Sequence, residues 1–253
     1  MTAADTILEV EEVSRSYREG GKEFLALERV KFQLNKEDFV CIVGPSGCGK
    51  STLLRILVGL DRPTSGTVRF LGEPVRTGDA RLGMVFQSFA LFPWLTVEQN
   101  VEIGLEARHV PAEERRAKAR KHLDGVGLTG FENAYPRELS GGMKQRVGIA
   151  RALSLEPVLL CMDEPFSSLD ALTSQTLRDE ILQIWSDREV TPNAILMVTH
   201  SIEEAVYLAD RVIVMTGRPG TVKAQCEIDL PRPRNPKEPE FFGWVDEIYS
   251  LII

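Results

Sequence analysis

A glycine-rich loop carries the most explicit chemistry in the sequence. Residues 44–51 read GPSGCGKS and fit the phosphate-binding pattern G-x-x-x-x-G-K-[ST], in which glycines let successive backbone amides face an anion. Lys50 can reach the terminal phosphates of a nucleotide, and the Ser51 hydroxyl can bind Mg²⁺. The alternative is an ordinary glycine-rich turn. The apolar run Phe39–Val43 before the loop and the helical pattern Thr52–Leu60 after it favour the phosphate site, because the helix adds its positive N-terminal end.

Two adjacent carboxylates follow another apolar run. Val158–Met162 has the length of a buried strand, and Asp163 and Glu164 come directly after it. Asp163, at the end of the strand, is placed to hold the hydration shell of Mg²⁺. Glu164 is then free to orient the attacking water or to accept its proton. A solvated strand end would explain the pair alone, but the phosphate loop favours the catalytic interpretation.

A second glycine-bearing helix start lies in the segment Leu139-Ser140-Gly141-Gly142-Met143. Ser140 is a good helix N-cap, and the two glycines allow the backbone to approach another anion closely. The alternative is a plain helix cap. An ordinary phosphate-loop kinase or GTPase has no need of a second site of this kind.

With these segments in place, the chain resembles an ATP-binding cassette (ABC) domain, and the resemblance covers nearly the whole sequence in the family's order. In that family two cassettes dimerise head to tail, and each ATP lies between the phosphate loop of one and the L-S-G-G motif of the other. The resemblance implies that Tyr17 stacks on adenine, although a lone tyrosine is often a core or surface residue. It also implies that Gln87 contacts Mg²⁺ and the attacking water, and that His200 contacts the γ-phosphate.

The residues and the resemblance together predict a complete hydrolytic site. Met143 stands where many members carry glutamine, but the anion-facing role belongs to Ser140 and the glycines, so activity should survive. The predicted nucleotide-binding residues are Tyr17, Gly44, Pro45, Ser46, Gly47, Cys48, Gly49, Lys50, Ser51 and Thr52; the catalytic residues are Gln87, Glu164 and His200; the Mg²⁺ ligands are Ser51, Gln87 and Asp163; the residues acting in trans are Leu139, Ser140, Gly141, Gly142 and Met143; and the loop facing the partner cassette is Ser167, Ser168, Leu169 and Asp170.

The elements that must position these residues alternate between strand-length and helical patterns. The predicted strands are Ile7–Val13, Phe39–Val43, Val158–Met162, Ala194–Val198 and Arg211–Met215, and the predicted helices are Thr52–Leu60, Ala112–Gly125, Gly142–Leu153, Leu172–Trp185 and Ile202–Ala209. Such alternation is typical of an α/β fold with a mainly parallel sheet. We expect a P-loop NTPase cassette over residues 1–230, with an antiparallel β subdomain that includes hairpin material at Val68–Val75 and an inserted α-helical subdomain at about 88–157.

The C-terminal tail, 231–253, has too few residues for a separate regulatory domain. Its proline-rich part, Pro231–Pro239, is predicted to be an extended surface segment. The part that follows, Phe241–Ile253, is aromatic and apolar at helical spacing and is predicted to be a short docked helix, with a partner-binding helix as the alternative.

Composition narrows the class of protein. The net charge of −7 disfavours general nucleic-acid binding, which requires a basic face. The four cysteines form no C-x-x-C pair, so neither a disulfide framework nor a zinc site is indicated; Cys41 and Cys161 are predicted to be small buried hydrophobes. Cys48 is a reactive thiol protected by ATP if it is exposed, and an inert thiol if it is buried. No secretory signal and no membrane-spanning run is apparent.

Further phrases resemble the nitrate, aliphatic sulfonate and taurine importer cassettes. They are Gly59–Gly66, Val206–Val212, Gly217–Gly220 and Asp229–Arg234. This resemblance implies a peripheral subunit at the cytoplasmic face of the plasma membrane. Its partners would be a second cassette, two transmembrane permease subunits and, indirectly, a substrate-binding protein. The aromatic stretch Ser88–Asn100 could line a groove for a permease helix, or it could fill the core of its own subdomain.

Two other functions remain open from the sequence. One is a soluble cassette ATPase of a machine that does not transport, such as iron–sulfur assembly, against which only the subgroup phrases argue. The other is a nucleotide-sensing module that does not hydrolyse ATP, against which Glu164 and His200 argue.

Overall fold

The structure is a computed structural model that describes residues 6–186 and 192–253. Residues 1–5, part of the N-terminal stretch that lacks a signal-peptide pattern, lie outside the described residues. The chain divides into two compact units, one made of residues 1–79 with 194–253 and the other of residues 80–193. We refer to them as the first and the second unit.

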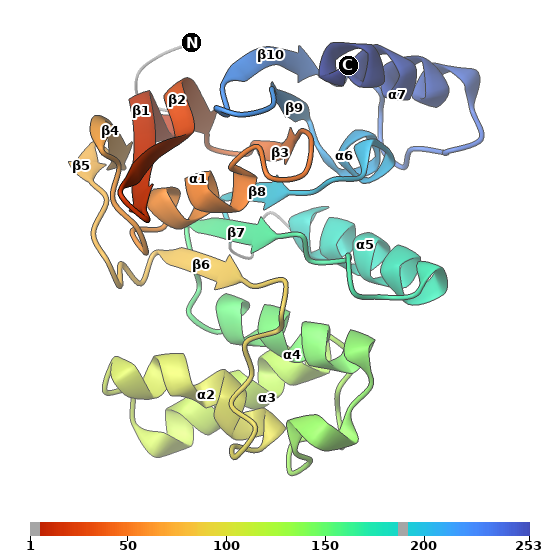
Figure 1. Cartoon of the computed structure of the whole chain (residues 1–253). Helices are drawn as coiled ribbons and strands as arrows, with labels where there is room; N and C mark the ends of the chain where they lie inside the picture. The colour runs from red at the N-terminus through yellow and green to blue at the C-terminus, as the bar shows by residue number, and fades with distance from the viewer. Residues whose placement is uncertain (1–5, 187–191) are drawn as a thin grey trace. The chain divides into compact units, whose positions relative to one another are not determined.

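The first unit contains an antiparallel sheet built on a long hairpin (Figure 1). Strands β1 (Thr6–Glu19) and β2 (Lys22–Asn35) are joined through Gly20 and Gly21, which both have positive φ. On the other side of β1 lie β4 (Ser65–Phe70) and β5 (Glu73–Pro74), which gives the order β2-β1-β4-β5. This sheet is the predicted antiparallel β subdomain.

The first unit also contains the strands that carry the phosphate loop. β3 (Phe39–Val43) pairs in parallel with β8 (Ala194–Val198) and with β9 (Arg211–Met215), and β10 (Val222–Glu227) is antiparallel to β9. All residues of β3 and β8 are buried, which explains their continuous apolar sequences. The helices of this unit are α1 (Lys50–Leu57), α6 (Ile202–Leu208) and α7 (Pro239–Ile252), and α7 packs against α6 (Figure 1).

The second unit is mostly helical. Its two strands, β6 (Leu82–Val85) and β7 (Leu159–Asp163), are parallel. Between them lie α2 (Val97–Ala107), α3 (Ala112–Gly125), the short 3₁₀ helix η1 (Pro136–Glu138) and α4 (Gly141–Leu153), and α5 (Ala171–Ser186) follows β7. Helices α2, α3 and α4 pack on one another, so their apolar faces form a local core.

The predicted α/β class is confirmed, and most predicted elements are present. β3, β8, β9 and α3 begin and end at the predicted residues. The expectation for the proline-rich tail is wrong in one respect. Most of its residues are exposed, but Arg234 is only 5% exposed, and its guanidinium lies in a shell of carbonyls that binds it. Among the described residues, no helix combines the length and the apolarity needed to cross a bilayer.

Candidate nucleotide-binding and hydrolysis site

The phosphate loop begins where β3 ends and continues into α1. Helix α1 has Gly49 as its N-cap, in a left-handed conformation (φ 99°, ψ 10°), with no side-chain hydrogen bond to the first turn. A Cβ at this position would lie 2.7 Å from Cδ2 of Leu27, so only glycine fits. Because no side chain caps the helix, the amides of its first turn remain available to an anion.

Lys50 is folded against the loop that precedes it. Its side chain is 5% exposed, and Nζ donates to the carbonyl oxygen of Gly44 at 2.8 Å and to that of Pro45 at 3.2 Å. In the part of the chain that the structure describes, no carboxylate forms an ion pair with this ammonium. The charge of Lys50 is therefore not neutralised within the described chain, and it raises the affinity of the loop for phosphate.

The loop after β9 supports the phosphate loop from outside. Nε of Arg218 donates to the carbonyl oxygen of Gly47 at 2.9 Å. Gly220 donates its backbone N–H to Ala26 at 2.9 Å, and a Cβ at Gly220 would lie 1.9 Å from the carbonyl oxygen of Cys48. In the sequence, Gly217–Gly220 stands out only as a phrase shared with importer cassettes. The two glycines that flank its Arg-Pro pair are the available signal for a close approach of the backbone.

Cys48 is buried, which contradicts an exposed thiol and favours the inert alternative. Desolvation raises the pKa of the Cys48 thiol, and the nearby Lys50 ammonium, 4.0 Å from Sγ, offsets this only in part. Cys41 and Cys161 are also buried, as predicted.

Tyr17 is fixed at its hydroxyl. The phenol donates to Oδ2 of Asp61 at 2.8 Å, and the guanidinium of Arg15 lies 4.4 Å from the ring centroid while also pairing with Asp61 at 2.8 Å. The ring is 37% exposed, so it offers a partly open aromatic surface held in one orientation.

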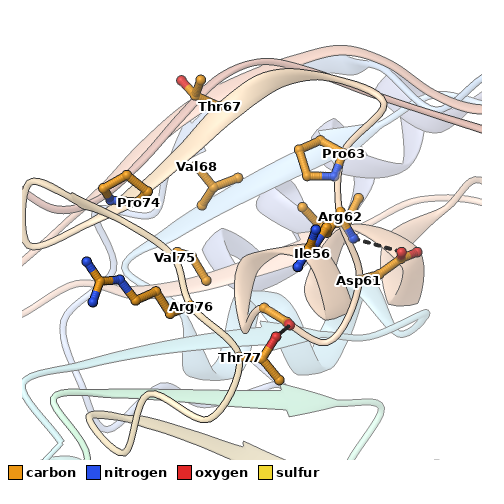
Figure 2. Close-up of a pocket in the computed structure, with 11 residues that line it drawn as sticks. Ile56, Asp61, Arg62, Pro63, Thr67, Val68, Pro74, Val75, Arg76 and Thr77 are labelled. Carbon is orange, nitrogen blue, oxygen red and sulfur yellow. Dashed lines mark hydrogen bonds between the residues drawn. The ribbon is translucent and has the colours of Figure 1, made fainter.

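Asp61 also lines a cavity of about 590 Å³ between the end of α1 and the β4–β5 hairpin. Figure 2 shows Asp61 and Arg62 on the loop after α1, with Val68 of β4 and Pro74 of β5 on the hairpin side. None of the predicted nucleotide-binding residues lines this cavity. The cavity is therefore separate from the phosphate loop.

His200 lies at the same edge of the parallel strands as the phosphate loop. Ile42 of β3 is in register with Val198 of β8, and the backbone N–H of Thr199 donates to the carbonyl oxygen of Ile42 at 3.1 Å. Gly44 and His200 come two residues after Ile42 and Val198, respectively, at the ends of these paired strands. The side chain of His200 is exposed, and Ser201 caps α6 directly after it by accepting from the backbone N–H of Glu204.

In the second unit, the end of β7 gathers three predicted residues. Nε2 of Gln87 donates to Oε2 of Glu164 at 3.2 Å and to Oγ of Ser167 at 3.2 Å, and Ser167 Oγ donates to the Glu164 carbonyl oxygen at 3.0 Å. Glu164 has φ 44°, an uncommon conformation for a residue with a side chain. Asp163, immediately before it, is 6% exposed.

The L-S-G-G segment forms the start of α4 as predicted. Oγ of Ser140 accepts from the backbone N–H of Met143 at 3.3 Å, and Ser140 and Gly141 are exposed. Gly142 packs closely on α5, because a Cβ there would lie 2.4 Å from Cγ2 of Thr173. Asp170 in turn accepts from the backbone N–H of Thr173 at 3.0 Å.

Arg151, near the end of α4, was missed by the sequence analysis. Its guanidinium donates to the carbonyl oxygens of Ala90 at 2.6 Å and Phe89 at 3.0 Å, and both acceptors have positive φ. Burial lowers the pKa of Arg151. This contact fixes the loop after Gln87 to α4, the helix that Ser140 caps.

The predicted site residues thus fall in both units. Tyr17, residues 44–52 and His200 belong to the first unit, and Gln87, Asp163, Glu164, residues 139–143 and residues 167–170 belong to the second. Comparison with known proteins shows that the sequence profile of the ABC transporter family matches residues 27–167. The chain belongs to the ABC transporter family. The family predicted from the motifs is therefore confirmed, and the chain is an ABC ATPase.

Individual relatives cover nearly the whole chain. The nitrate import ATP-binding protein of Synechocystis is 47% identical, with 97% of this chain and 94% of that protein covered. The aliphatic sulfonates import ATP-binding protein of Bacillus cereus is 42% identical, over 92% of this chain and 90% of that protein. An uncharacterised ABC transporter ATP-binding protein of Methanocaldococcus jannaschii is 46% identical, over 97% of this chain and 91% of that protein.

The fold is also found in a solved structure. A dimeric, post-hydrolysis ATP-binding cassette bound to ADP and Pi is 32% identical, with a TM-score of 0.79, and covers 89% of this ABC chain and 100% of its own. The cassette fold is therefore confirmed.

Proposed function

We propose that this ABC ATPase powers an importer for a small solute of the nitrate or sulfonate kind. The observation that carries the proposal is the hydrogen bond from Gln87 to Glu164, the residue that follows Asp163. This bond holds in place the carboxylate that would promote hydrolysis. The names of the nitrate and sulfonate import relatives support the transport role and the subgroup.

In this proposal the site residues divide the work of binding and hydrolysis. The uncapped amides of α1 and the Lys50 ammonium hold the phosphates of ATP, and the ring of Tyr17 supports adenine. Glu164 orients the attacking water and accepts its proton, with Gln87 fixing the carboxylate. His200 contacts the γ-phosphate. Phosphoryl transfer needs mainly positioning and charge neutralisation, and these are the tasks that the residues would perform.

We propose that ATP is bound together with Mg²⁺. The candidate ligands Ser51, Gln87 and Asp163 carry one hydroxyl, one amide oxygen and one carboxylate, and each is a hard oxygen donor of the type Mg²⁺ prefers. So few protein ligands suit an ion that completes its shell with phosphate oxygens and water. When bound, Mg²⁺ would supply positive charge to the phosphates.

We propose further that two cassettes, identical or closely related, enclose ATP between the phosphate loop of one and Ser140–Gly142 of the other. The exposure of Ser140 and Gly141 and the dimeric cassette structures of similar fold support this. Closing and opening of the dimer would drive two permease subunits, with a substrate-binding protein acting indirectly. This places the chain at the cytoplasmic face of the membrane.

The permease would dock on the segment after Gln87. Trp94 is 70% exposed and its ring lies 5.6 Å from that of Phe92. An exposed aromatic side chain of this size is typical of a protein interface. The contact of Arg151 with the backbone of this segment gives it a fixed shape.

The substitution Glu164→Gln tests the hydrolytic role. It keeps the shape of the side chain and removes the base, so ATP binding should be unchanged, turnover should fall at least about hundredfold, and an ATP-bound dimer should accumulate. Turnover and sedimentation of the same preparation measure both effects. Glu203→Gln, on the exposed face of α6, is the matched control. Unchanged turnover in Glu164→Gln would remove Glu164 from this role and favour a module that only senses nucleotide.

A further inference from the structure

The segment Asp229–Arg234, DLPRPR, has no part in the proposed chemistry, yet it is bound tightly to the first unit. We call it the C-terminal strap. Arg234 is 5% exposed, and its guanidinium donates four hydrogen bonds to backbone carbonyl oxygens. A buried guanidinium that donates to four main-chain carbonyls holds those carbonyls in a fixed arrangement, unlike a solvated side chain.

Two of these acceptors belong to the C-terminal end of α6. Nη1 of Arg234 donates to the carbonyl oxygens of Val206 at 2.5 Å and Ala209 at 2.6 Å. Nη2 of Arg232 donates to that of Leu208, also at 2.5 Å. Two guanidinium groups therefore bind three of the carbonyls that a helix leaves without partners at its end, where positive charge is favourable.

The other contacts of Arg234 and Arg232 fix the strap to its surroundings. Arg234 also binds the carbonyl oxygens of Leu230 at 2.9 Å and Ile228 at 3.2 Å. Burial lowers the pKa of Arg234 to about 10, which still leaves the guanidinium charged at neutral pH. Nε1 of Trp244, on α7, donates to Oδ1 of Asp229 at 3.1 Å.

Arg232 connects the strap to the strand that leads into the phosphate loop. Its Nη1 donates to Oδ1 of Asp210 at 2.5 Å, while Oδ2 of Asp210 accepts from the backbone N–H of Phe39 at 3.0 Å. Phe39 is the first residue of β3, and the phosphate loop follows the last. The strap therefore binds α6 and β3 at the same time.

The opposite end of α6 carries His200. The helix has only seven residues, and His200 immediately precedes its N-cap, Ser201. Thr199 strengthens this end, since its Oγ1 donates to Oε2 of Glu204 at 2.5 Å and accepts from the backbone N–H of Ser201 at 3.1 Å. The contacts at both ends therefore connect the Arg234 carbonyl contacts to His200 through a helix of two turns.

We propose that the C-terminal strap sets the position of His200 relative to the phosphate loop, with Arg234 as the principal positioning residue. The catalytic consequence rests on the proposed role of His200. The geometric consequence, that α6 and His200 shift together when the strap is released, does not depend on that role.

The experiment uses the imidazole NMR signals of the full chain. The sequence has three histidines, His109, His122 and His200, so each signal can be assigned with one substitution. In Arg234→Met, which keeps the bulk of the side chain and removes the fork, the His200 signal should shift or broaden, while those of His109 and His122 stay in place. Arg116→Met, at an exposed position on α3, is the matched control and should leave all three signals unchanged.

Steady-state hydrolysis provides the second readout. Arg234→Met should lower kcat about tenfold and change KM for ATP less than about twofold, because nucleotide binding depends on the phosphate loop. Arg234→Lys should recover part of kcat, since it restores the charge at the helix end but not the planar fork. Because a loss of folded protein would also lower the apparent kcat at an unchanged KM, kcat is calculated from the concentration of ATP-binding sites, which calorimetric titration of the same preparation gives.

Arg232→Met is the second variant if Arg234→Met does not fold. It removes the bonds to Leu208 and Asp210 only, and it should move the His200 signal in the same direction by a smaller amount. An unchanged His200 signal in a folded strap variant overturns the proposal. If the signal moves and kcat does not, the strap positions His200 but the proposed role of His200 in hydrolysis is wrong.

Discussion

Two helix starts in this ABC ATPase are built in opposite ways. Helix α1 begins at Gly49, whose left-handed backbone leaves the first-turn amides without a side-chain cap. Helix α4 begins at Ser140, whose own hydroxyl caps the helix through Met143. The first start has no side-chain cap, whereas the second carries its own. The difference agrees with the proposed roles, in which the start of α1 binds the nucleotide of its own chain and the start of α4 contributes to the site of a second copy.

The largest expected effect is on the uncapped start. Lys50→Met removes the ammonium that lies against the Gly44 and Pro45 carbonyls of the phosphate loop, so the Kd of the single chain for ATP should rise about hundredfold or more. Isothermal titration calorimetry measures it. Lys36→Met, at an exposed position before β3, should bind as the unsubstituted chain does. A change below about threefold in Lys50→Met would contradict the assignment of α1 as the primary site.

The capped start should respond differently. Ser140→Ala should leave the Kd of the single chain for ATP unchanged, but it should weaken ATP-dependent dimerisation about tenfold and lower the free energy of unfolding by about 1 kcal/mol. Sedimentation and chemical denaturation measure the two effects. Ser140→Thr keeps the hydroxyl and is the matched control. Weaker ATP binding by the Ser140→Ala monomer would show that this serine acts on the nucleotide of its own chain.

A smaller effect is expected outside the phosphate loop. Arg218→Met removes the hydrogen bond to the Gly47 carbonyl and should raise the Kd for ATP about threefold to tenfold, because the loop keeps its amides and Lys50. Lys223→Met, on β10 and exposed, controls for the lost positive charge. The same Kd in both variants would show that the support from Arg218 does not reach the nucleotide.

The smallest effect concerns Cys48. Because burial raises the pKa of its thiol, the thiolate fraction near pH 7 is lower than that of an ordinary cysteine, and alkylation should be slow with or without ATP. The rate should keep rising with pH beyond about 8.5, the usual thiol pKa. Mass spectrometry of the peptide that contains Cys48 gives this rate, and the urea-unfolded chain is the control. Rapid labelling of the folded chain at pH 7 would contradict the buried geometry.

The sequence predicted the parts of the fold whose signals are local. β3, β8 and β9 are continuous apolar runs, and α3 has clear ends at Ala112 and Gly125. The elements without a stated prediction have weaker patterns. In β10 only Cys226 is buried, and β6 has four residues, so neither differs clearly from a loop in sequence. Strand β2 alternates between exposed and buried residues only in its second half, where Arg29, Lys31 and Gln33 are exposed.

Within the candidate site, too, the sequence identified the residues whose signal is local and missed those that depend on distant contacts. The phosphate loop and the L-S-G-G segment place their groups next to one another in the chain, so spacing alone identifies them. Arg151, Arg218 and Arg234 donate hydrogen bonds to backbone carbonyl oxygens. The acceptor Ala90 lies 61 residues from Arg151 in the sequence, and the acceptor Gly47 lies 171 residues from Arg218. A carbonyl acceptor carries no residue identity, so no sequence pattern pairs it with a distant arginine. The positive φ of Glu164 is likewise set by its surroundings and not by its residue type.

The most direct test of the account mixes two inactive copies in the Glu164→Gln background. One copy carries Lys50→Met and the other Ser140→Arg, so each lacks one of the two helix starts, and only a mixed dimer contains one intact pair. The account predicts that neither copy forms an ATP-dependent dimer alone and that the mixture forms one holding a single ATP. Failure of the mixture to dimerise, when the chain with Glu164→Gln alone does, would contradict the claim that the two starts act across two copies.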